Sequence, residues 1–390
     1  MKPTAYNRIE SIDLLKGLVM VIMALDHVRD YFHYDSFFFD PADPAKTTLP
    51  IFFTRWITHF CAPAFSFLAG LSAYMAGKRR TRGELSSFLL KRGLWLVLLE
   101  FTIITFGWYF DLQWRTINAL VIWSLGVSMV VLSALIYLPR QYVLWFSLVL
   151  IFGHNLLDNL QVGNSVVWDV LHRQNVYALS AHRQVLIGYP LIPWIAVMSL
   201  GYWFGGIYEP GVDPAKRKKI LTGLGLASLL LFVVLRATNI YGNPVPWKPY
   251  DSFVKGLMDF LNPAKYPPSL QYLLMTLGGA FLFLAFTEKC RGKIAGFFST
   301  YGRVPFFYYI LHIYLLHIIA MIAAQLTGFG WQSFVLPTFI IFVPDLQGYG
   351  FSLLAVYGFW ILVVLLLYPL CKKFDRYKQQ HREKWWLSYL

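Results

Sequence analysis

Long apolar stretches alternate with short polar segments along the whole chain. Ten of the stretches are about 17–25 residues long, which is enough for a helix to cross roughly 30 Å of hydrocarbon. They cover residues 11–31, 52–76, 86–109, 116–138, 141–157, 185–207, 218–238, 269–287, 304–324 and 350–371. The pattern therefore predicts an all-α polytopic membrane bundle of about ten transmembrane helices.

The segments between the predicted spans contain no recognisable soluble domain and no internal repeat. The longest of them, 32–51, 158–184 and 239–268, have little continuous apolar pattern, and we expect loops with short interfacial helices there. The apolar segment 334–343 is too short for a span and favours a re-entrant or interfacial piece. We expect one domain over 1–390.

Composition and charge agree with a membrane protein. The chain is 57% hydrophobic and only 14% charged, whereas a soluble domain needs a charged surface. If the N-terminus is cytoplasmic, 24 of the 34 Lys and Arg residues fall on the cytoplasmic side, which predicts two cytoplasmic termini. This placement explains the net charge of +14 without a nucleic acid partner. The three cysteines are scattered, and we expect neither a disulfide framework nor a metal site.

A cluster of ionisable residues closes the first span. Asp26, His27, Arg29 and Asp30 follow the apolar run "LLKGLVMVIMAL" at its predicted outer end. On a helix, Asp26 can contact Arg29, and His27 can contact Asp30, because each pair is three residues apart. Polar residues also end spans simply by reaching the headgroups. Ionisable groups this close to the hydrocarbon are nevertheless candidates for a functional site.

The second span begins with another polar pair. Arg55 and His59 are four residues apart and share a helix face near the outer boundary. Arg55 is either a headgroup anchor or part of the site. The same face continues with small residues that permit close helix packing, namely Ala62, Ser66, Gly70, Ala73 and Gly77. We therefore expect this face to pack inward.

Two further polar residues lie within predicted spans. Glu100 occupies the middle of the third span, where a carboxylate lines a substrate path or forms a structural hydrogen bond. His312 in the ninth span shares a face with Tyr308 and Tyr309. It is either a buried histidine satisfied by a tyrosine hydroxyl or a neighbour of the outer site.

Several motifs resemble a known family of membrane enzymes. The opening "RIESIDLLKGLVMVIMALDH" is similar to the first helix of a large superfamily of transmembrane acyltransferases, with matches at Arg8, Asp13 and Gly17. "FCAPAFSFLAGLS", "VIWSLGVSMVVLSAL", "YPLIPWIAVMSLGYWFGGIY" and "YGRVPFFYYILH" resemble the heparan-α-glucosaminide N-acetyltransferase branch, best its uncharacterised bacterial relatives. The likeness touches most of the chain.

The resemblance implies a substrate pair and a location. Cytoplasmic acetyl-CoA would be the acyl donor, and a carbohydrate or glycoconjugate amine or hydroxyl at the outer face of a bacterial inner membrane would be the acceptor. Aligned on "APAFSFLAG", the branch's aspartate falls on His59 and its catalytic histidine on Leu49. In the wider superfamily a histidine closes the first helix, and His27 matches it.

These points give a working assignment. We expect His27 to act as general base or as a covalently acetylated nucleophile, with Asp30 orienting it and His59 completing the catalytic group. We expect Asp26, Arg29, Arg55, Glu100 and His312 to contact substrates, with Arg55 also able to stabilise an oxyanion. Arg8 and Asp13 are donor-side or structural residues. A transporter using the same outer polar cluster, or a membrane protein without turnover, remains the alternative. The oligomeric state is not readable from the sequence.

Overall fold

The structure is a computed structural model that describes residues 9–160, 162–163, 165–381 and 383–388. It is mostly helical. The longer helices are α1 (Glu10–Phe32), α3 (Cys61–Gly77), α4 (Arg82–Leu99), α6 (Val121–Leu135), α7 (Arg140–Gly153), α9 (Leu191–Phe204), α10 (Pro214–Thr238), α12 (Leu270–Thr287), α13 (Lys293–Arg303), α14 (Pro305–Leu326) and α15 (Leu353–Gln380). The shorter ones are α2 (Leu49–Trp56), α5 (Thr105–Tyr109), α8 (Val166–Leu171) and α11 (Phe253–Phe260).

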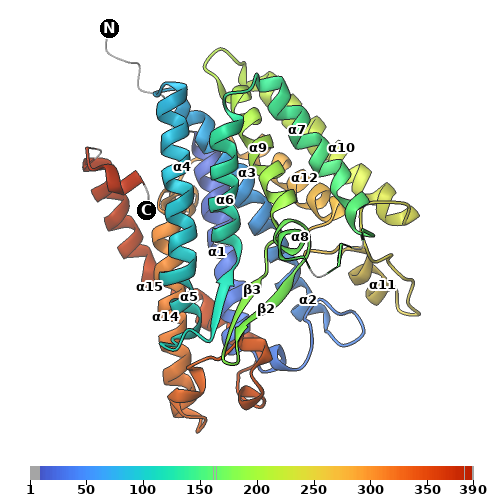
Figure 1. Cartoon of the computed structure of the whole chain (residues 1–390), viewed down its shortest axis with the longest axis vertical. Coiled ribbons are helices and arrows are strands. Elements are labelled where there is room, and N and C mark those ends of the chain that lie inside the picture. Colours follow the sequence, from blue (N-terminus) through green and yellow to red (C-terminus); the bar gives the residue numbers. More distant parts are fainter. Residues whose placement is uncertain (1–8, 161, 164, 382, 389–390) are drawn as a thin grey trace.

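The long helices form a bundle with two distinct ends (Figure 1). We call the end formed by the loops 78–81, 209–213 and 288–292 the basic end; it carries ion pairs such as Lys78 with Glu209 and Arg217 with Glu288. We call the opposite end the sheet end. It consists of the loops 33–48, 239–269 and 327–352 together with a small β-sheet.

Each of the ten predicted ranges contains a helix, but they differ in length and polarity. Among the described residues, six helices are long and apolar enough to cross a membrane: Leu49–Gly77, Leu191–Tyr208, Pro214–Thr238, Leu270–Thr287, Pro305–Leu326 and Leu353–Gln380. Of the others, α6 has 15 residues and α7 has 14, while α1 and α4 carry charged residues. The chain therefore has the apolar helices of a multi-pass membrane protein.

The prediction of an all-α fold is wrong in one region. Strands β1 (Thr116–Ala119), β2 (Asn175–Ser180) and β3 (Arg183–Ile187) form a sheet in the order β1-β3-β2. Strand β1 pairs parallel to β3, and β2 and β3 form an antiparallel hairpin. The predicted spans 116–138 and 185–207 therefore begin with strands, because short apolar strands run directly into the apolar helices that follow them.

Other boundaries also change. Residues 49–77 are one predicted span but comprise α2, a 3₁₀ turn (Ile57–Phe60) and α3. A π-turn (Glu100–Ile104) joins α4 to α5. The apolar segment 334–343 forms short 3₁₀ turns at the sheet end, with Phe334 and Ile340 buried. The expected short helices in the sheet-end loops are present as α8 and α11.

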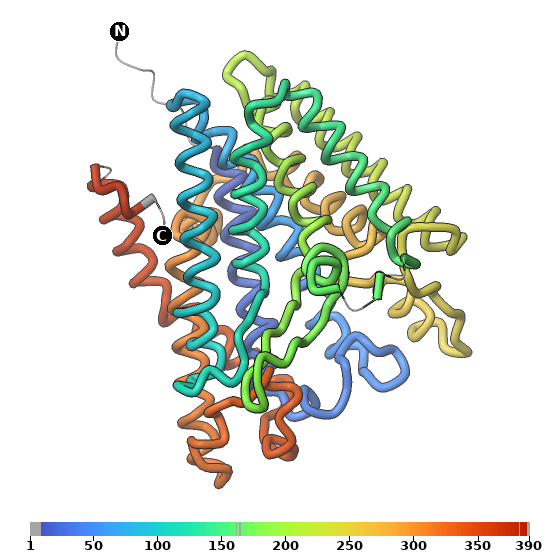
Figure 2. Tube along the Cα trace, in the orientation of Figure 1, coloured from blue at the N-terminus to red at the C-terminus, as the bar shows by residue number. Residues whose placement is uncertain are grey.

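Helix α1 runs through the middle of the bundle and packs against α3, α12, α13, α14 and α15 (Figure 2). The predicted small-residue face on α3 is confirmed. A Cβ atom on Gly70 would lie 1.8 Å from the Met198 carbonyl oxygen in α9, and one on Gly201 would lie 2.0 Å from the Phe67 carbonyl oxygen. Glycines on both helices thus bring the two backbones into direct contact.

Candidate functional site

Two histidines that are far apart in the sequence meet inside the bundle. His27 near the end of α1 places its Nδ1 2.8 Å from Nε2 of His312 in α14. The two rings are nearly parallel, at 15°, with centroids 5.0 Å apart. Of the two alternatives for His312, the structure supports the neighbour of the site.

The hydrogen bonds of this pair define which nitrogens carry protons. His312 Nδ1 lies 3.2 Å from the Tyr308 carbonyl oxygen, which can only accept, so Nδ1 is the donor. In neutral His312 the lone pair is then on Nε2, and His27 must donate to it from Nδ1. The lone pair of His27 is left on its Nε2, and no hydrogen bond within the described residues engages that atom. His27 is therefore held in the tautomer that a general base needs.

Aromatic side chains enclose the histidine pair. Trp108 from α5 meets the His27 ring edge-on at 4.8 Å, and Tyr309 lies 6.3 Å from it on the same helix as His312. His312 is fully buried, while His27 keeps partial exposure. A substrate can therefore contact the exposed side of the His27 ring, whereas the side that faces His312 is shielded from water.

A network of charges lies beside His27. Asp26 forms an ion pair with Arg29 at 2.8 Å and accepts a hydrogen bond from Arg55 at 2.5 Å, and Arg29 donates to Asp30 at 2.6 Å. The predicted pair of Asp26 and Arg29 is thus confirmed. The predicted contact of His27 with Asp30 is not formed among the described residues, because Asp30 pairs with Arg29 and His27 bonds to His312. Asp26 instead joins α1 to α2 through Arg55.

His59 lies at the edge of this region rather than within the network. It belongs to the 3₁₀ turn after α2, is 2% exposed, and its carbonyl accepts the Tyr272 hydroxyl at 2.7 Å. Its Nδ1 is buried and has no hydrogen-bond partner within the described part of the chain. The break between α2 and α3 separates His59 from Arg55, so the two do not form the continuous helical face that the sequence suggested.

Glu100 is fully buried, and its contacts are structural. Its carboxylate accepts the backbone N–H groups of Leu120, at 3.3 Å, and of Trp123, at 3.1 Å. These groups begin α6, whose N-cap position lacks a capping side chain. Of the two alternatives for Glu100, this geometry supports the structural hydrogen bond, with the carboxylate capping α6 from a neighbouring helix.

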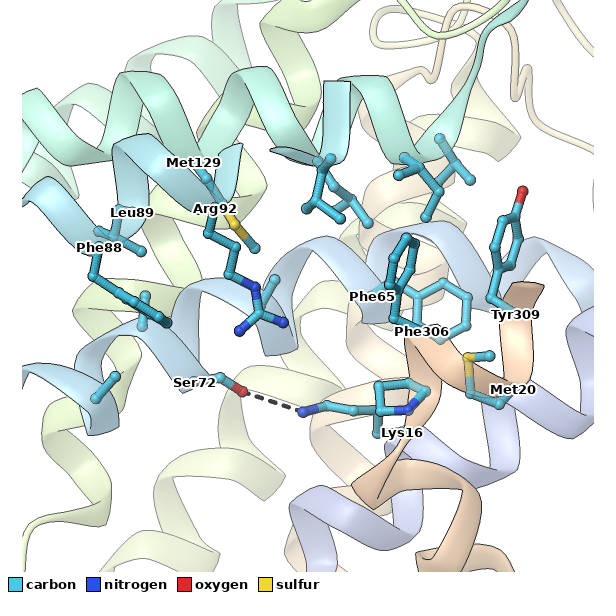
Figure 3. A pocket seen from close by; sticks show the side chains of 18 of the residues that line it. Lys16, Met20, Phe65, Ser72, Phe88, Leu89, Arg92, Met129, Phe306 and Tyr309 are labelled. Carbon is cyan, nitrogen blue, oxygen red and sulfur yellow. Dashed lines mark hydrogen bonds between the residues drawn. The ribbon is translucent and has the colours of Figure 1, made fainter. Parts of the chain in front are cut away.

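A pocket of about 190 Å³ inside the bundle has Lys16, Ser72 and Arg92 in its wall, together with Tyr309, a neighbour of the histidine pair (Figure 3). Lys16 donates to Ser72 at 3.2 Å on one side of it, and the side chain of Arg92 points into the same space. Tyr309 lines the other part and lies 5.4 Å from the His312 ring. The remaining wall is apolar and includes Met20, Phe65, Ala69, Leu96, Val121 and Phe306.

Several residues of this site were not identified from the sequence. Lys16 and Arg92 entered the sequence-based prediction only as two of the 24 basic residues on the cytoplasmic side. Trp108 belongs to the aromatic residues that gather at span ends in any membrane protein. Only the position of a cation inside an apolar run, as for Lys16, was a usable signal.

The remaining expectations concern the basic end and metals. Arg8 lies outside the described residues. Asp13 is buried in α1, and its carbonyl oxygen would lie 1.9 Å from a Cβ on Gly302, so this region is a close contact between α1 and α13. Among the described residues, no group of three His, Cys, Asp or Glu side chains is arranged to hold a metal ion.

The sequence profile of the heparan-alpha-glucosaminide N-acetyltransferase catalytic family matches residues 8–240. The chain belongs to this family. Membrane acetyltransferase activity is characteristic of the family, and acetyl-CoA is its acyl donor. A search of curated proteins finds no match.

The family match includes one half of the histidine pair. His27, Arg55 and His59 lie within the matched residues, whereas His312 lies beyond them in α14. Leu49, near which the sequence resemblance places the catalytic histidine of the heparan branch, begins α2 and is 45% exposed. The geometry of this chain offers His27 as its base candidate instead.

Proposed function

We propose that this protein transfers an acetyl group from cytoplasmic acetyl-CoA to an amine or hydroxyl of a sugar at the outer face of the membrane. The observation that carries the proposal is the unengaged Nε2 of His27, which is held by His312. Tyr309, 6.3 Å from the His27 ring, also lines a pocket whose wall includes the two cations Lys16 and Arg92. The basic end is then the donor side and the sheet end the acceptor side.

The lining of the pocket suits the pantetheine chain that carries the thioester of acetyl-CoA. Its wall is largely apolar, as a pantetheine chain requires, and Lys16 and Arg92 provide positive charge for phosphate groups. Tyr309 links the pocket to the histidine pair. An acetyl group carried along this path would arrive beside His27.

The proposed reaction requires one base. His27 Nε2 removes the proton of the acceptor as its nitrogen or oxygen attacks the thioester carbonyl carbon. The new bond to carbon forms, the carbon–sulfur bond breaks, and CoA leaves as a thiolate that takes up a proton. His312 holds His27 in position and accepts the Nδ1 hydrogen bond, which stabilises the charged imidazole.

For the topology we propose ten membrane crossings with both termini in the cytoplasm. The charge bias toward the basic end and the helices in all ten predicted ranges support it. Cys290 gives a test with the native chain, because it is exposed at the basic end whereas Cys61 and Cys371 are buried. A membrane-impermeant thiol reagent should label Cys290 in inverted vesicles. Labelling in intact cells would contradict the orientation.

The activity is tested by CoA release from acetyl-CoA, using purified full-length protein in lipid nanodiscs. Amino sugars and lipid-linked sugars serve as acceptors. His27→Gln should lower the rate by about 10²–10⁴-fold, the usual contribution of a general base. The control is His317→Gln, a change at another buried histidine of α14. Absence of acetyl-CoA binding and of release in folded wild-type protein would contradict the proposal and favour transport through the same polar cluster.

A further inference from the structure

Lys265 is a buried cation without a polar partner. It lies in the sheet-end segment between α11 and α12 and is 8% exposed. Its ammonium group lies 5.2 Å from the centre of the Tyr266 ring. No hydrogen bond or ion pair involves this ammonium group anywhere in the described chain. Most of this side chain is removed from water, and no acceptor in the protein replaces the water that the ammonium group has lost.

Other buried cations of the protein are compensated. Arg236, 2% exposed, donates to the backbone carbonyls of Phe260, Val245, Asp259 and Asn262. Arg29 and Arg55 share the carboxylate of Asp26. Lys265 thus differs from cations that serve packing, and it requires a different explanation.

The ammonium group lies near the candidate site. It is close enough to act electrostatically on Asp26, His27 and His59. Three cations, Arg29, Arg55 and Lys265, stand there against the two carboxylates of Asp26 and Asp30. The region therefore carries an excess of positive charge, even with both carboxylates ionised.

Tyr266 connects this positive region to the surface. Its side chain is 38% exposed, and its hydroxyl lies 3.4 Å from that of Tyr189. Burial alone raises the pKa of the Tyr266 phenol, but the charges of Lys265 and Arg55 outweigh it and lower the pKa below its ordinary value. Two cations therefore act on the hydroxyl of a side chain that is partly exposed. The buried, unpartnered Nδ1 of His59 is a second polar group in this region that lacks a partner.

We propose that Lys265, together with His59 and the Tyr266 hydroxyl, binds an anionic group of the acceptor, such as a phosphate, sulfate or carboxylate. The identity of this ligand as the acceptor rests on the proposed acetyltransferase function, whereas anion binding does not. The anion supplies the missing partner of Lys265 and places the acceptor beside His27. The substrate class becomes an anionic sugar or glycoconjugate.

The binding step is tested first, without any turnover. The melting temperature of the full chain in phosphatidylcholine nanodiscs is measured with inorganic phosphate, with sulfate, and with chloride at equal ionic strength. Wild type should be stabilised by phosphate or sulfate, and Lys265→Gln should lose this shift. Lys248→Gln is the matched control, because Lys248 is exposed in the same sheet-end region. An equal shift in all three proteins would overturn the proposal.

A second readout uses the cost of the unpaired charge. In anion-free buffer Lys265→Met should melt at a higher temperature than wild type, because it replaces a largely buried charged side chain that has no acceptor in the protein by an apolar one. A lower melting temperature would show that Lys265 has a stabilising partner and would contradict the proposal. This readout does not depend on the choice of anion.

Turnover then tests whether the anion belongs to the acceptor. CoA release is compared for glucosamine and glucosamine 6-phosphate. Lys265→Gln should raise KM for the phosphorylated sugar roughly ten- to a hundredfold, the range expected for a hydrogen bond to a charged group. The KM for glucosamine, which carries no anionic group, should change much less than the KM for the phosphorylated sugar. Equal effects on both sugars would contradict a role in acceptor recognition.

Two further comparisons tell a lipid headgroup from an acceptor as the source of the anion, and distinguish the anion-site proposal from the acetyltransferase proposal. Replacing phosphatidylcholine by phosphatidylglycerol should leave the phosphate-dependent shift unchanged. Loss of that shift would assign the site to a lipid headgroup and overturn the acceptor assignment. Anion binding without CoA release would contradict the acetyltransferase function alone, and CoA release without a Lys265-dependent anion shift would contradict the anion site alone.

Discussion

His312 accepts the Nδ1 proton of His27 across a distance of 2.8 Å, and Tyr308 in turn holds the Nδ1 proton of His312. This order of donors fixes the free lone pair on His27 Nε2. We expect His312→Ala to lower kcat by roughly ten- to a hundredfold, since one hydrogen bond of about 1–3 kcal/mol is lost. His312→Gln, which keeps an acceptor oxygen, should recover part of the rate and the wild-type pH profile. Equal losses in both variants would contradict a positioning role.

His317 provides the control for that experiment. It is buried on the same helix and bonds to the carbonyls of Gly107 and Phe334. His317→Gln should lower the melting temperature and leave kcat of the folded fraction unchanged. A selective loss of kcat would mean that the control residue itself belongs to the reaction.

The shared carboxylate of Asp26 should be essential for stability. Asp26→Asn leaves Arg55 buried without its counter-charge and Arg29 with Asp30 alone, and breaking a buried pair typically costs about 3–5 kcal/mol. The melting temperature should fall sharply. The double variant Asp26→Asn/Arg55→Met should recover part of the loss. If Asp26→Asn melts like wild type, the network is solvated rather than buried.

Variants of Glu100 can distinguish a structural role of this residue from a substrate-binding role. Glu100→Ala should destabilise the protein by about 1–3 kcal/mol, because the N–H groups of Leu120 and Trp123 lose their acceptor. Glu100→Gln retains one acceptor oxygen and should lose less. Thermal melting and CoA release on the same samples are the measurements. A stable Glu100→Ala protein with a raised KM would instead favour contact with a substrate.

A larger side chain in the pocket should weaken the binding of acetyl-CoA. Ala69→Phe projects a ring into the space between Arg92 and Tyr309 and should raise KM for acetyl-CoA at least about tenfold, the loss expected when about 1.4 kcal/mol of binding is removed. Ala237→Phe, an exposed position on α10, is the matched control and should have no effect. Titration with acetyl-CoA by calorimetry checks binding directly. Unchanged affinity in Ala69→Phe would place the donor elsewhere.

Close helix contacts predict which glycines tolerate a methyl group. Gly70→Ala would place Cβ 1.8 Å from the Met198 carbonyl oxygen and should cost at least about 1–3 kcal/mol by forcing α3 from α9. Gly223→Ala in α10 meets nothing within 4 Å and should be neutral or stabilising by about 0.4–1 kcal/mol. The yield of folded protein and its melting temperature distinguish the two. Equal tolerance would contradict the packing of α3 on α9.

The sequence predicted the features that depend on local spacing. The helices follow from uninterrupted apolar runs, and the bond between Asp26 and Arg29 follows from three-residue spacing on one helix. The small-residue face of α3 was visible for the same reason. The strands were missed because β1 and β3 are short and lie next to apolar helices, so their period of two was hidden.

Contacts between distant segments were not predictable. His27 and His312 are 285 residues apart, and nothing in either neighbourhood specifies the other. The partners of Glu100 are backbone groups, which leave no mark on the sequence. Lys265 looked like an ordinary loop cation, and only its burial without a partner distinguishes it.

The bond between His27 and His312 also has a consequence for biosynthesis. His27 emerges from the ribosome early, within the first helix of the bundle, but its partner is made only when α14 (Pro305–Leu326) is translated. The N-terminal part of a chain is synthesised and folds first. His27 therefore has no His312 to accept its Nδ1 hydrogen bond while most of the bundle assembles. The proposed base therefore gains its partner only when one of the last helices is in place, and a prematurely terminated chain would contain His27 without the residue that holds it.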